Sequence, residues 1–89
     1  MMKVMKPLII DVREPDEFKS SHVEGALNIP VGDILNARKV LPGLPSEGHY
    51  VLYCQSGGRA GQAKAALERL GYTHIENGIS QEHIEAGWE

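Results

Sequence analysis

The chain has 89 residues, a length that suits one small domain and leaves too little sequence for two. Its 42% hydrophobic and 24% charged residues are close to the average of globular proteins, which excludes a disordered chain. Nine Lys and Arg against twelve Asp and Glu give a formal net charge of −3, which offers no basic surface to nucleic acid or to an anionic membrane. We therefore expect residues 1–89 to form a single domain, a monomer that binds neither nucleic acid nor a membrane.

Cysteine usage and hydropathy indicate the cellular compartment. The single Cys cannot form an internal disulfide, which suits the reducing cytoplasm better than an oxidising compartment. Three apolar residues between Pro7 and Asp11 are too few for the hydrophobic region of a signal peptide, and no apolar run approaches the ~18 residues of a membrane span. We expect a cytoplasmic protein, and a periplasmic location would require a leader that has been removed.

Apolar runs, helical spacing and turn residues predict that strands and helices alternate. Short apolar runs, β-branched or alternating, predict four strands, at 8–12, 26–29, 49–54 and 72–76. Start signals and helical spacing predict four helices: one from Glu14 that ends before Gly25, two at 32–41 and 59–70, and a last short one with Ser80 as its N-cap. Such alternation builds right-handed βαβ units, so we predict an α/β fold, a small parallel β-sheet flanked by helices on both faces.

One segment combines residues that favour thiol chemistry. Cys54 ends a strand and the next helix begins at Arg59, so Gln55, Ser56, Gly57 and Gly58 must form a tight loop at the carboxyl edge of the sheet. Amides of such a loop and the helix N-terminus surround the sulfur with donors, which lowers a thiol pKa from its usual ~8.5. Arg59 adds a forked cation for an oxyanion. A lone Cys after an apolar strand is often only a core residue, but a core residue needs neither the Gly pair nor the Arg.

Two motifs carry a resemblance to a known family. The segment Cys54-Gln55-Ser56-Gly57-Gly58-Arg59, read as C-x-x-G-x-R, resembles the active-site loop of rhodanese-domain sulfurtransferases. A second signature resembles the N-terminal motif of that family in order and spacing: Asp11-Val12-Arg13-Glu14-x-x-Glu17-Phe18, then His22-Val23-x-Gly25-Ala26-x-Asn28-Ile29-Pro30. The resemblance runs from about Leu8 to Asn77 and is greatest to small single-domain thiosulfate sulfurtransferases.

The sequence departs from the family pattern at both ends. Only seven residues precede Leu8, where the strand that leads into the N-terminal motif begins, so we expect a sheet one strand smaller than is usual in the family. After Asn77, the segment Gly78-Ile79-Ser80 stands where the family usually has Gly-Gly, and the family's nearby Trp is displaced to Trp88.

The resemblance implies a ping-pong transfer of sulfur. The Cys54 thiolate would attack the outer sulfur of thiosulfate, release sulfite and hold a persulfide, which a small thiol, cyanide or a sulfur-acceptor protein would then discharge. Cys54 would be the catalytic residue, and the loop Gln55, Ser56, Gly57, Gly58 and Arg59 would bind the substrate, with Arg59 on the sulfonate oxygens. No metal or organic cofactor is implied.

Two other functions are compatible with these residues. Phosphatases and arsenate reductases also place Cys and Arg around an anion-binding loop, but here four residues separate Cys54 from Arg59, one fewer than in a C-x5-R loop. A rhodanese-like module that only binds or regulates partners is the second alternative, which the presence of both residues disfavours. The four His residues show no metal-ligand spacing, and Asp11 and Arg13 are interpreted as a structural polar pair beside the loop.

Overall fold

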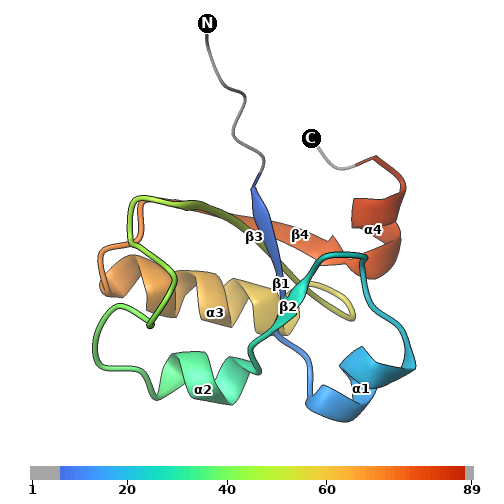
Figure 1. Cartoon of the computed structure of the whole chain (residues 1–89), viewed down its shortest axis with the longest axis horizontal. Coiled ribbons are helices and arrows are strands. Elements are labelled where there is room, and N and C mark those ends of the chain that lie inside the picture. The colour runs from blue at the N-terminus through green and yellow to red at the C-terminus, as the bar shows by residue number, and fades with distance from the viewer. Residues whose placement is uncertain (1–6, 88–89) are drawn as a thin grey trace, which may run out of the picture.

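The computed structural model describes residues 7–87, so Trp88 lies outside the described part of the chain. Figure 1 shows strands and helices alternating along it. Their bounds are β1 (Leu8–Asp11), α1 (Pro15–Ser20), β2 (Leu27–Asn28), α2 (Val31–Leu35), β3 (His49–Cys54), α3 (Gly58–Arg69), β4 (His74–Ser80) and α4 (Gln81–Glu85).

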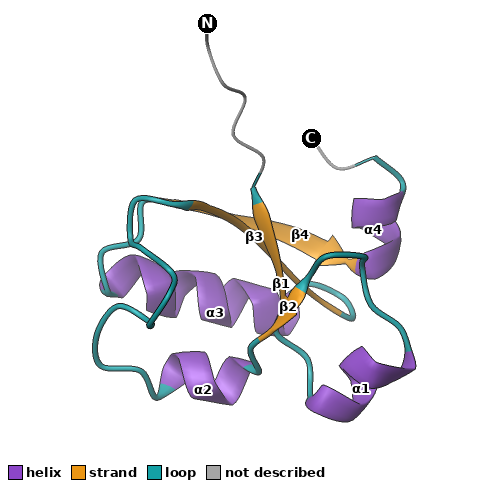
Figure 2. Ribbon diagram, viewed as in Figure 1, coloured by secondary structure: helices purple, strands orange, loops and turns teal. Residues whose placement is uncertain are grey.

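The strands form a four-stranded sheet in the order β2-β1-β3-β4, and every neighbouring pair is parallel (Figure 2). β1 and β3 occupy the centre, with Leu8 opposite Tyr50 and Asp11 opposite Tyr53. Parallel strands point their carboxyl ends to one edge, so Cys54 at the end of β3 lies at the same edge as the polar residues after β1.

Helices cover both faces of the sheet, which confirms the predicted α/β fold. Side chains of β3 alternate between the faces, as the two-residue period of a strand requires. Tyr50, Leu52 and Cys54 belong to the core beneath α2 and α3. Val51 and Tyr53 belong to a second core on the other face, beneath α1 and α4. Because β3 is buried on both faces, its sequence shows a continuous apolar run.

The helix predicted at 32–41 was wrong in extent, because α2 ends at Leu35. Beyond that point the pattern does not describe a buried helix face, since Leu35 and Val40 are both exposed. The chain is instead fixed by Tyr72, whose hydroxyl accepts a hydrogen bond from the Leu41 amide (3.0 Å) and donates one to the Leu44 carbonyl (2.6 Å). These tertiary hydrogen bonds hold the segment in a loop.

The strand predicted at 72–76 was wrong at both ends, because β4 runs from His74 to Ser80. Tyr72 lies outside the strand, and its hydroxyl makes the hydrogen bonds to Leu41 and Leu44 described above. At the other end the pairing with β3 slips by one residue, so that Leu52 pairs with Asn77 but Tyr53 pairs with Ile79. Gly78 is therefore the extra residue of a β-bulge, and its turn-like sequence conceals the continuation of the strand.

The first helix ends before Gly25, as predicted, since α1 runs from Pro15 to Ser20 with Glu14 as its N-cap. Ser21 has extended backbone (φ −170°), and its carbonyl accepts a hydrogen bond from Arg13 Nη2 at 2.7 Å. Smaller shifts occur elsewhere: the predicted strands 8–12 and 26–29 end at Asp11 and Asn28, and α3 begins at Gly58.

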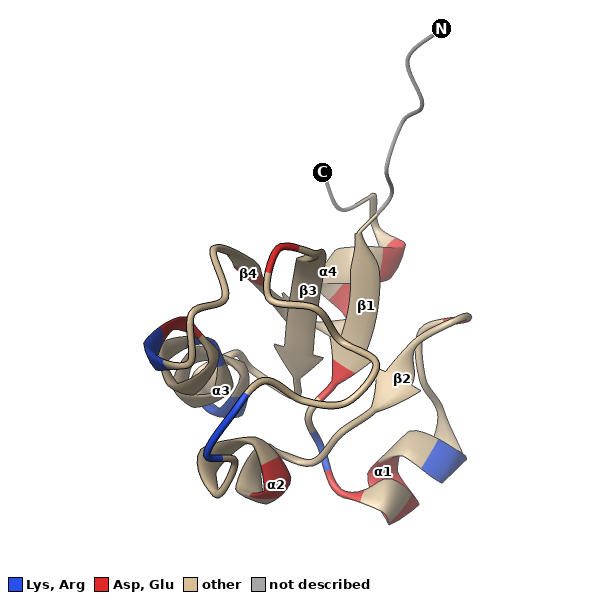
Figure 3. Ribbon diagram, turned by 60° about the vertical axis from the view of Figure 1, so that its left-hand side comes forward, with Lys and Arg blue, Asp and Glu red and all other residues tan. Residues whose placement is uncertain are grey.

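Charged residues are distributed over several elements (Figure 3). Lys and Arg lie on α1, on α3, in the loop after α2 and after β1, with Asp and Glu on the same or neighbouring elements. Within residues 7–87, no helix is both long enough and apolar enough to cross a membrane.

Candidate active site

The loop after β3 turns sharply because Gly57 adopts a left-handed conformation, with φ of +97°. A side chain is disfavoured at that φ, so this glycine is required by the turn. Gly58 is different: it opens α3, and a Cβ placed there would meet nothing within 4 Å. Of the predicted Gly pair, only Gly57 is required by the backbone conformation, whereas Gly58 is an unconstrained residue of the helix.

Backbone amides of this loop surround the sulfur of Cys54. The Gly57 amide donates to Sγ at 3.0 Å and the Ala60 amide at 3.5 Å. Burial of the thiol, which is 2% exposed, raises its pKa, but the amides of Ala60, Ser56, Gly57 and Arg59 lower it by more. The net direction is downward, as predicted, because four donors favour the thiolate over the thiol.

An open pocket of about 170 Å³ borders Cys54. Its lining comes from three parts of the chain that are distant in sequence: Arg13 after β1, Cys54 and Gln55 at the end of β3, and Ser80, Gln81 and Glu82 at the start of α4. Ser80 caps α4 as predicted, since its hydroxyl accepts a hydrogen bond from the His83 amide. The cap thereby fixes one wall of the pocket.

Arg59 does not line this pocket, because its guanidinium is paired with Glu17 of α1. Nη1 donates to Oε1 at 2.8 Å and Nη2 donates to Oε2 at 3.2 Å. Oε1 also accepts the Glu14 amide at the start of α1, so one carboxylate connects the first turns of two helices. The hydrogen bonds from Arg59 lower the pKa of Glu17 to about 2. Sequence reasoning included Glu17 in the family motif but did not foresee this partner.

A second ion pair, between Asp11 and Arg13, is much more buried, and its arginine lines the same pocket as Cys54. Asp11 is fully buried and accepts hydrogen bonds from the Arg13 backbone amide, Nε and Nη2 at 2.7 to 3.1 Å. The Arg13 guanidinium also lies over the Tyr53 ring, 5.5 Å from its centroid. Burial is the main cause that raises the pKa of Tyr53 to about 12, so this phenol stays neutral. The predicted structural polar pair is thus present.

The opposite flank of the loop is held by Asn77 of β4, a residue that sequence reasoning did not assign to the site. Its Nδ2 donates to the Gly57 carbonyl at 3.0 Å, and its Oδ1 accepts the Ile79 amide at 2.9 Å. Ile79 has φ of +74°, an unusual conformation for a β-branched residue. The one signal in the sequence was the departure from the Gly-Gly pattern at Gly78-Ile79-Ser80.

The predicted site residues therefore occupy three kinds of position. Cys54 and Gln55 line the pocket, whereas Ser56 and Gly57 contribute amides. Gly58 begins the helix, and Arg59 contributes its amide to the sulfur and its side chain to α1.

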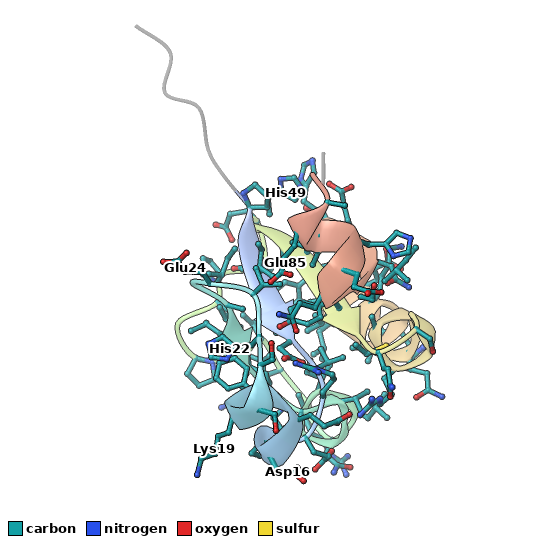
Figure 4. All side chains as sticks on the ribbon, turned by 90° about the vertical axis from the view of Figure 1, so that its right-hand side faces the viewer. Asp16, Lys19, His22, Glu24, His49 and Glu85 are labelled. Carbon is teal, nitrogen blue, oxygen red and sulfur yellow. The ribbon has the colours of Figure 1, made fainter. Side chains whose placement is uncertain are left out.

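Two of the histidines lie close together, since the rings of His49 and His74 are 5.7 Å apart, and His83 lies beside the pocket, where its Nδ1 is hydrogen-bonded to the Ser80 hydroxyl at 3.0 Å. His49 is at the end of the molecule opposite to Asp16 and Lys19 of α1 (Figure 4). Its Nε2 instead hydrogen-bonds Glu76 on the neighbouring strand. Among residues 7–87, no group of three or more His, Cys, Asp or Glu side chains is placed to hold a metal ion.

A parallel sheet with a cysteine surrounded by backbone amides at its carboxyl edge is the arrangement that the resemblance to rhodanese-domain sulfurtransferases implies. Comparison with known families agrees. The family described as the rhodanese-like domain matches residues 1–81. The chain belongs to that family, which confirms the family predicted from the two motifs.

Individual relatives extend this result. Thiosulfate sulfurtransferase PspE of Escherichia coli is 41% identical over 69 residues, which cover 76% of this chain and 64% of that protein. Human thiosulfate:glutathione sulfurtransferase is 35% identical over 81 residues, covering 78% of this chain and 70% of that one. A rhodanese from E. coli solved with anions superposes with a TM-score of 0.76 at 35% identity, over 88% of this chain and 91% of that one. The chain thus spans somewhat less than two thirds of PspE.

Proposed function

We propose that this protein is a rhodanese-type sulfurtransferase that carries sulfane sulfur as a persulfide on Cys54. The observation that supports it most is the ring of amides on Sγ, with Gly57 N at 3.0 Å and Ala60 N at 3.5 Å, beside an open pocket. This arrangement favours a standing thiolate that needs no histidine as a base. Relatives that bear the name thiosulfate sulfurtransferase support thiosulfate as a donor.

In the first half-reaction, the Cys54 thiolate attacks the outer sulfur of thiosulfate. A bond forms between Sγ and that sulfur while the sulfur–sulfur bond of thiosulfate breaks, and sulfite leaves with the bonding electron pair. The new terminal sulfur is anionic. Amides that point toward Sγ lie close to where this charge develops, and they need no reorganisation to stabilise it.

In the second half-reaction, a thiolate or cyanide attacks the terminal sulfur of the persulfide. The Sγ–S bond breaks, its electron pair returns to Cys54, and the acceptor leaves as a persulfide or as thiocyanate. The amides that stabilised the first thiolate stabilise it again. No electron is gained or lost overall, so this cycle requires no redox cofactor.

Binding of the sulfonate by Arg59 remains a prediction. The ion pair with Glu17 adds a condition to it, because Glu17 already occupies the guanidinium. Both terminal nitrogens of Arg59 are bonded to Glu17, so a sulfonate must share the guanidinium with that carboxylate or displace it. Substrate and Glu17 then compete for one cation. Arg13, which lines the pocket, is an alternative source of positive charge.

Mass spectrometry of the intact protein, before and after incubation with thiosulfate, tests the proposal. We expect the mass of one added sulfur atom, its removal by cyanide, and no addition to Cys54→Ser. A chain that gains no sulfur although Cys54 is reactive toward iodoacetamide would be a binding module. Hydrolysis of a phosphate ester that requires Cys54, without sulfur transfer, would instead favour the phosphatase alternative.

A further inference from the structure

Gly57 donates the shortest of the amide hydrogen bonds to Cys54 Sγ, and as a glycine it has a flexible backbone. Its N–H points at Sγ only while its left-handed conformation persists. Glycine has more accessible conformations than any other residue, so its orientation must be imposed by contacts on both of its sides. On the amino side that contact is the sulfur itself.

On the carbonyl side, Gly57 is held by two donors. Its oxygen accepts the Gly61 amide at 2.9 Å as part of α3, and it accepts Asn77 Nδ2 at 3.0 Å from β4. The helix bond fixes the carbonyl relative to α3 only. The bond from Asn77 fixes it relative to the sheet, which is where Cys54 is anchored.

Asn77 is itself held in one orientation. Its Oδ1 accepts the Ile79 amide at 2.9 Å, so the carboxamide nitrogen must be the atom that faces Gly57. A flipped amide would place an oxygen against the Gly57 carbonyl and a donor against the Ile79 donor. The contact is thus directional.

The β-bulge places Asn77 where it can make both bonds. Gly78 is the extra residue, and a Cβ there would lie only 2.7 Å from Val51 Cγ1 and 3.0 Å from Ile84 Cδ1. The chain then continues through Ile79 in the left-handed region, which is strained for a β-branched residue. A strained, tightly packed feature beside a reactive loop indicates a functional constraint.

We propose that Asn77 is a positioning residue for sulfur transfer, one that ties the Gly57 peptide to the sheet so that the Gly57 amide stays aimed at Cys54. The proposal rests on the assignment of Cys54 as the reactive thiol. It predicts that loss of Asn77 affects the thiolate more than it affects the fold.

The test is the pH dependence of Cys54 alkylation by iodoacetamide, with the free energy of unfolding measured in parallel. The charged groups that face the thiol are Arg13 and Glu82 at the pocket and Arg59 on α3, and all three are retained. Asn77→Ala should raise the midpoint of alkylation by roughly half to one pH unit, since one directed amide is loosened. Asn77→Leu keeps the size of the side chain and adds no charge but loses the donor to Gly57, so it should raise the midpoint as well.

Asn28→Ala is the matched control, because Asn28 also donates two hydrogen bonds at this edge of the sheet, to the Asp11 and Arg13 carbonyls at 3.0 and 2.9 Å. It should cost stability without moving the midpoint. Ile79→Gly, which retains the Asn77 side chain, should also leave the midpoint in place.

The proposal is overturned if both Asn77 variants keep the wild-type midpoint, or if Asn28→Ala moves it as far. Should Asn77→Ala fail to fold, the Asn77→Leu profile decides by itself. Alkylation needs no sulfur donor, so a failure of the proposed sulfur transfer would leave a shifted midpoint intact.

Discussion

The two flanks of the Cys54 loop are held by different kinds of interaction, an ion pair on one side and neutral hydrogen bonds on the other. On the α1 side, Arg59 and Glu17 form an ion pair whose side chains are each about one third exposed, at 31% and 32%. On the β4 side, Asn77 makes two neutral hydrogen bonds over a β-bulge. An exposed ion pair is weak and easily rearranged, because water screens it. Hydrogen bonds of a fixed carboxamide are directional. The charged flank is therefore suited to exchange partners with an anionic substrate, and the neutral flank to preserve geometry.

The largest effect is expected from removal of the Cys54 sulfur, which lies between the two flanks. Cys54→Ser should abolish sulfur transfer from thiosulfate to cyanide, because a hydroxyl provides no soft, ionised nucleophile. Steady-state assays of thiocyanate formation measure this. Serine is smaller and sits among the same amides, so circular dichroism should show an unchanged fold. Substantial residual turnover would contradict the assignment of Cys54.

Removal of the cation from the charged flank should come next. Arg59→Ala should lower kcat/KM for thiosulfate by about ten- to a hundredfold, mainly through KM, because a hydrogen bond to a charged group is worth about 1.5–3 kcal/mol. Glu17→Gln frees Arg59 from its charged competitor and should lower KM. Arg69→Ala, at the exposed far end of α3, is the control and should change neither parameter.

Pre-loaded protein separates binding from loop geometry. Persulfide already on Cys54 of Arg59→Ala should discharge to cyanide at the wild-type rate in single turnover, since the loop amides remain. Discharge that slows as much as loading would mean that Arg59 acts on the sulfur or on the loop, and that the charged flank also preserves geometry.

The neutral flank can be tested through the two adjacent glycines. Gly57→Ala should destabilise the protein by about 1–2 kcal/mol and slow alkylation of Cys54, because its φ of +97° disfavours a side chain. Gly58→Ala should be neutral or stabilising by up to about 1 kcal/mol, since it lies in α3 with open space around the added Cβ. Urea denaturation measures both. Equal losses from the two variants would show that the turn is not the requirement.

The smallest expected effect is the pH dependence of the ion pair. The pKa of Glu17 falls from 4.5 to about 2 in the folded protein, so the folded state binds fewer protons than the unfolded state between those values. The stability from the pair is present above pH 4.5 and is lost as the pH falls toward 2. Discounted for exposure, it amounts to about 0.2–1 kcal/mol. The difference in unfolding free energy between wild type and Glu17→Gln should shrink over this range.

The sequence by itself determined the family and the parallel α/β fold, and it singled out Cys54 as the candidate reactive residue. These follow from local signals: the apolar run of β3 reports burial on both faces, and Cys54, Gly57 and Arg59 lie within six consecutive residues. Chain direction alone then places the loop at the carboxyl edge of the sheet. No partner from elsewhere in the chain is needed for that inference.

Tertiary structure decided which groups serve the loop and where several elements end. Arg59 pairs with Glu17, 42 residues away, and Gly57 with Asn77, 20 residues away. Tyr72 converts the predicted end of the second helix into a loop through hydrogen bonds across about 30 residues, and the bulge at Gly78 extends β4 beyond its apolar pattern. Such contacts join common side chains whose identity alone does not indicate a partner. Their partners become fixed only when the packed sheet brings the segments together, because local propensity carries no information about distant donors and acceptors.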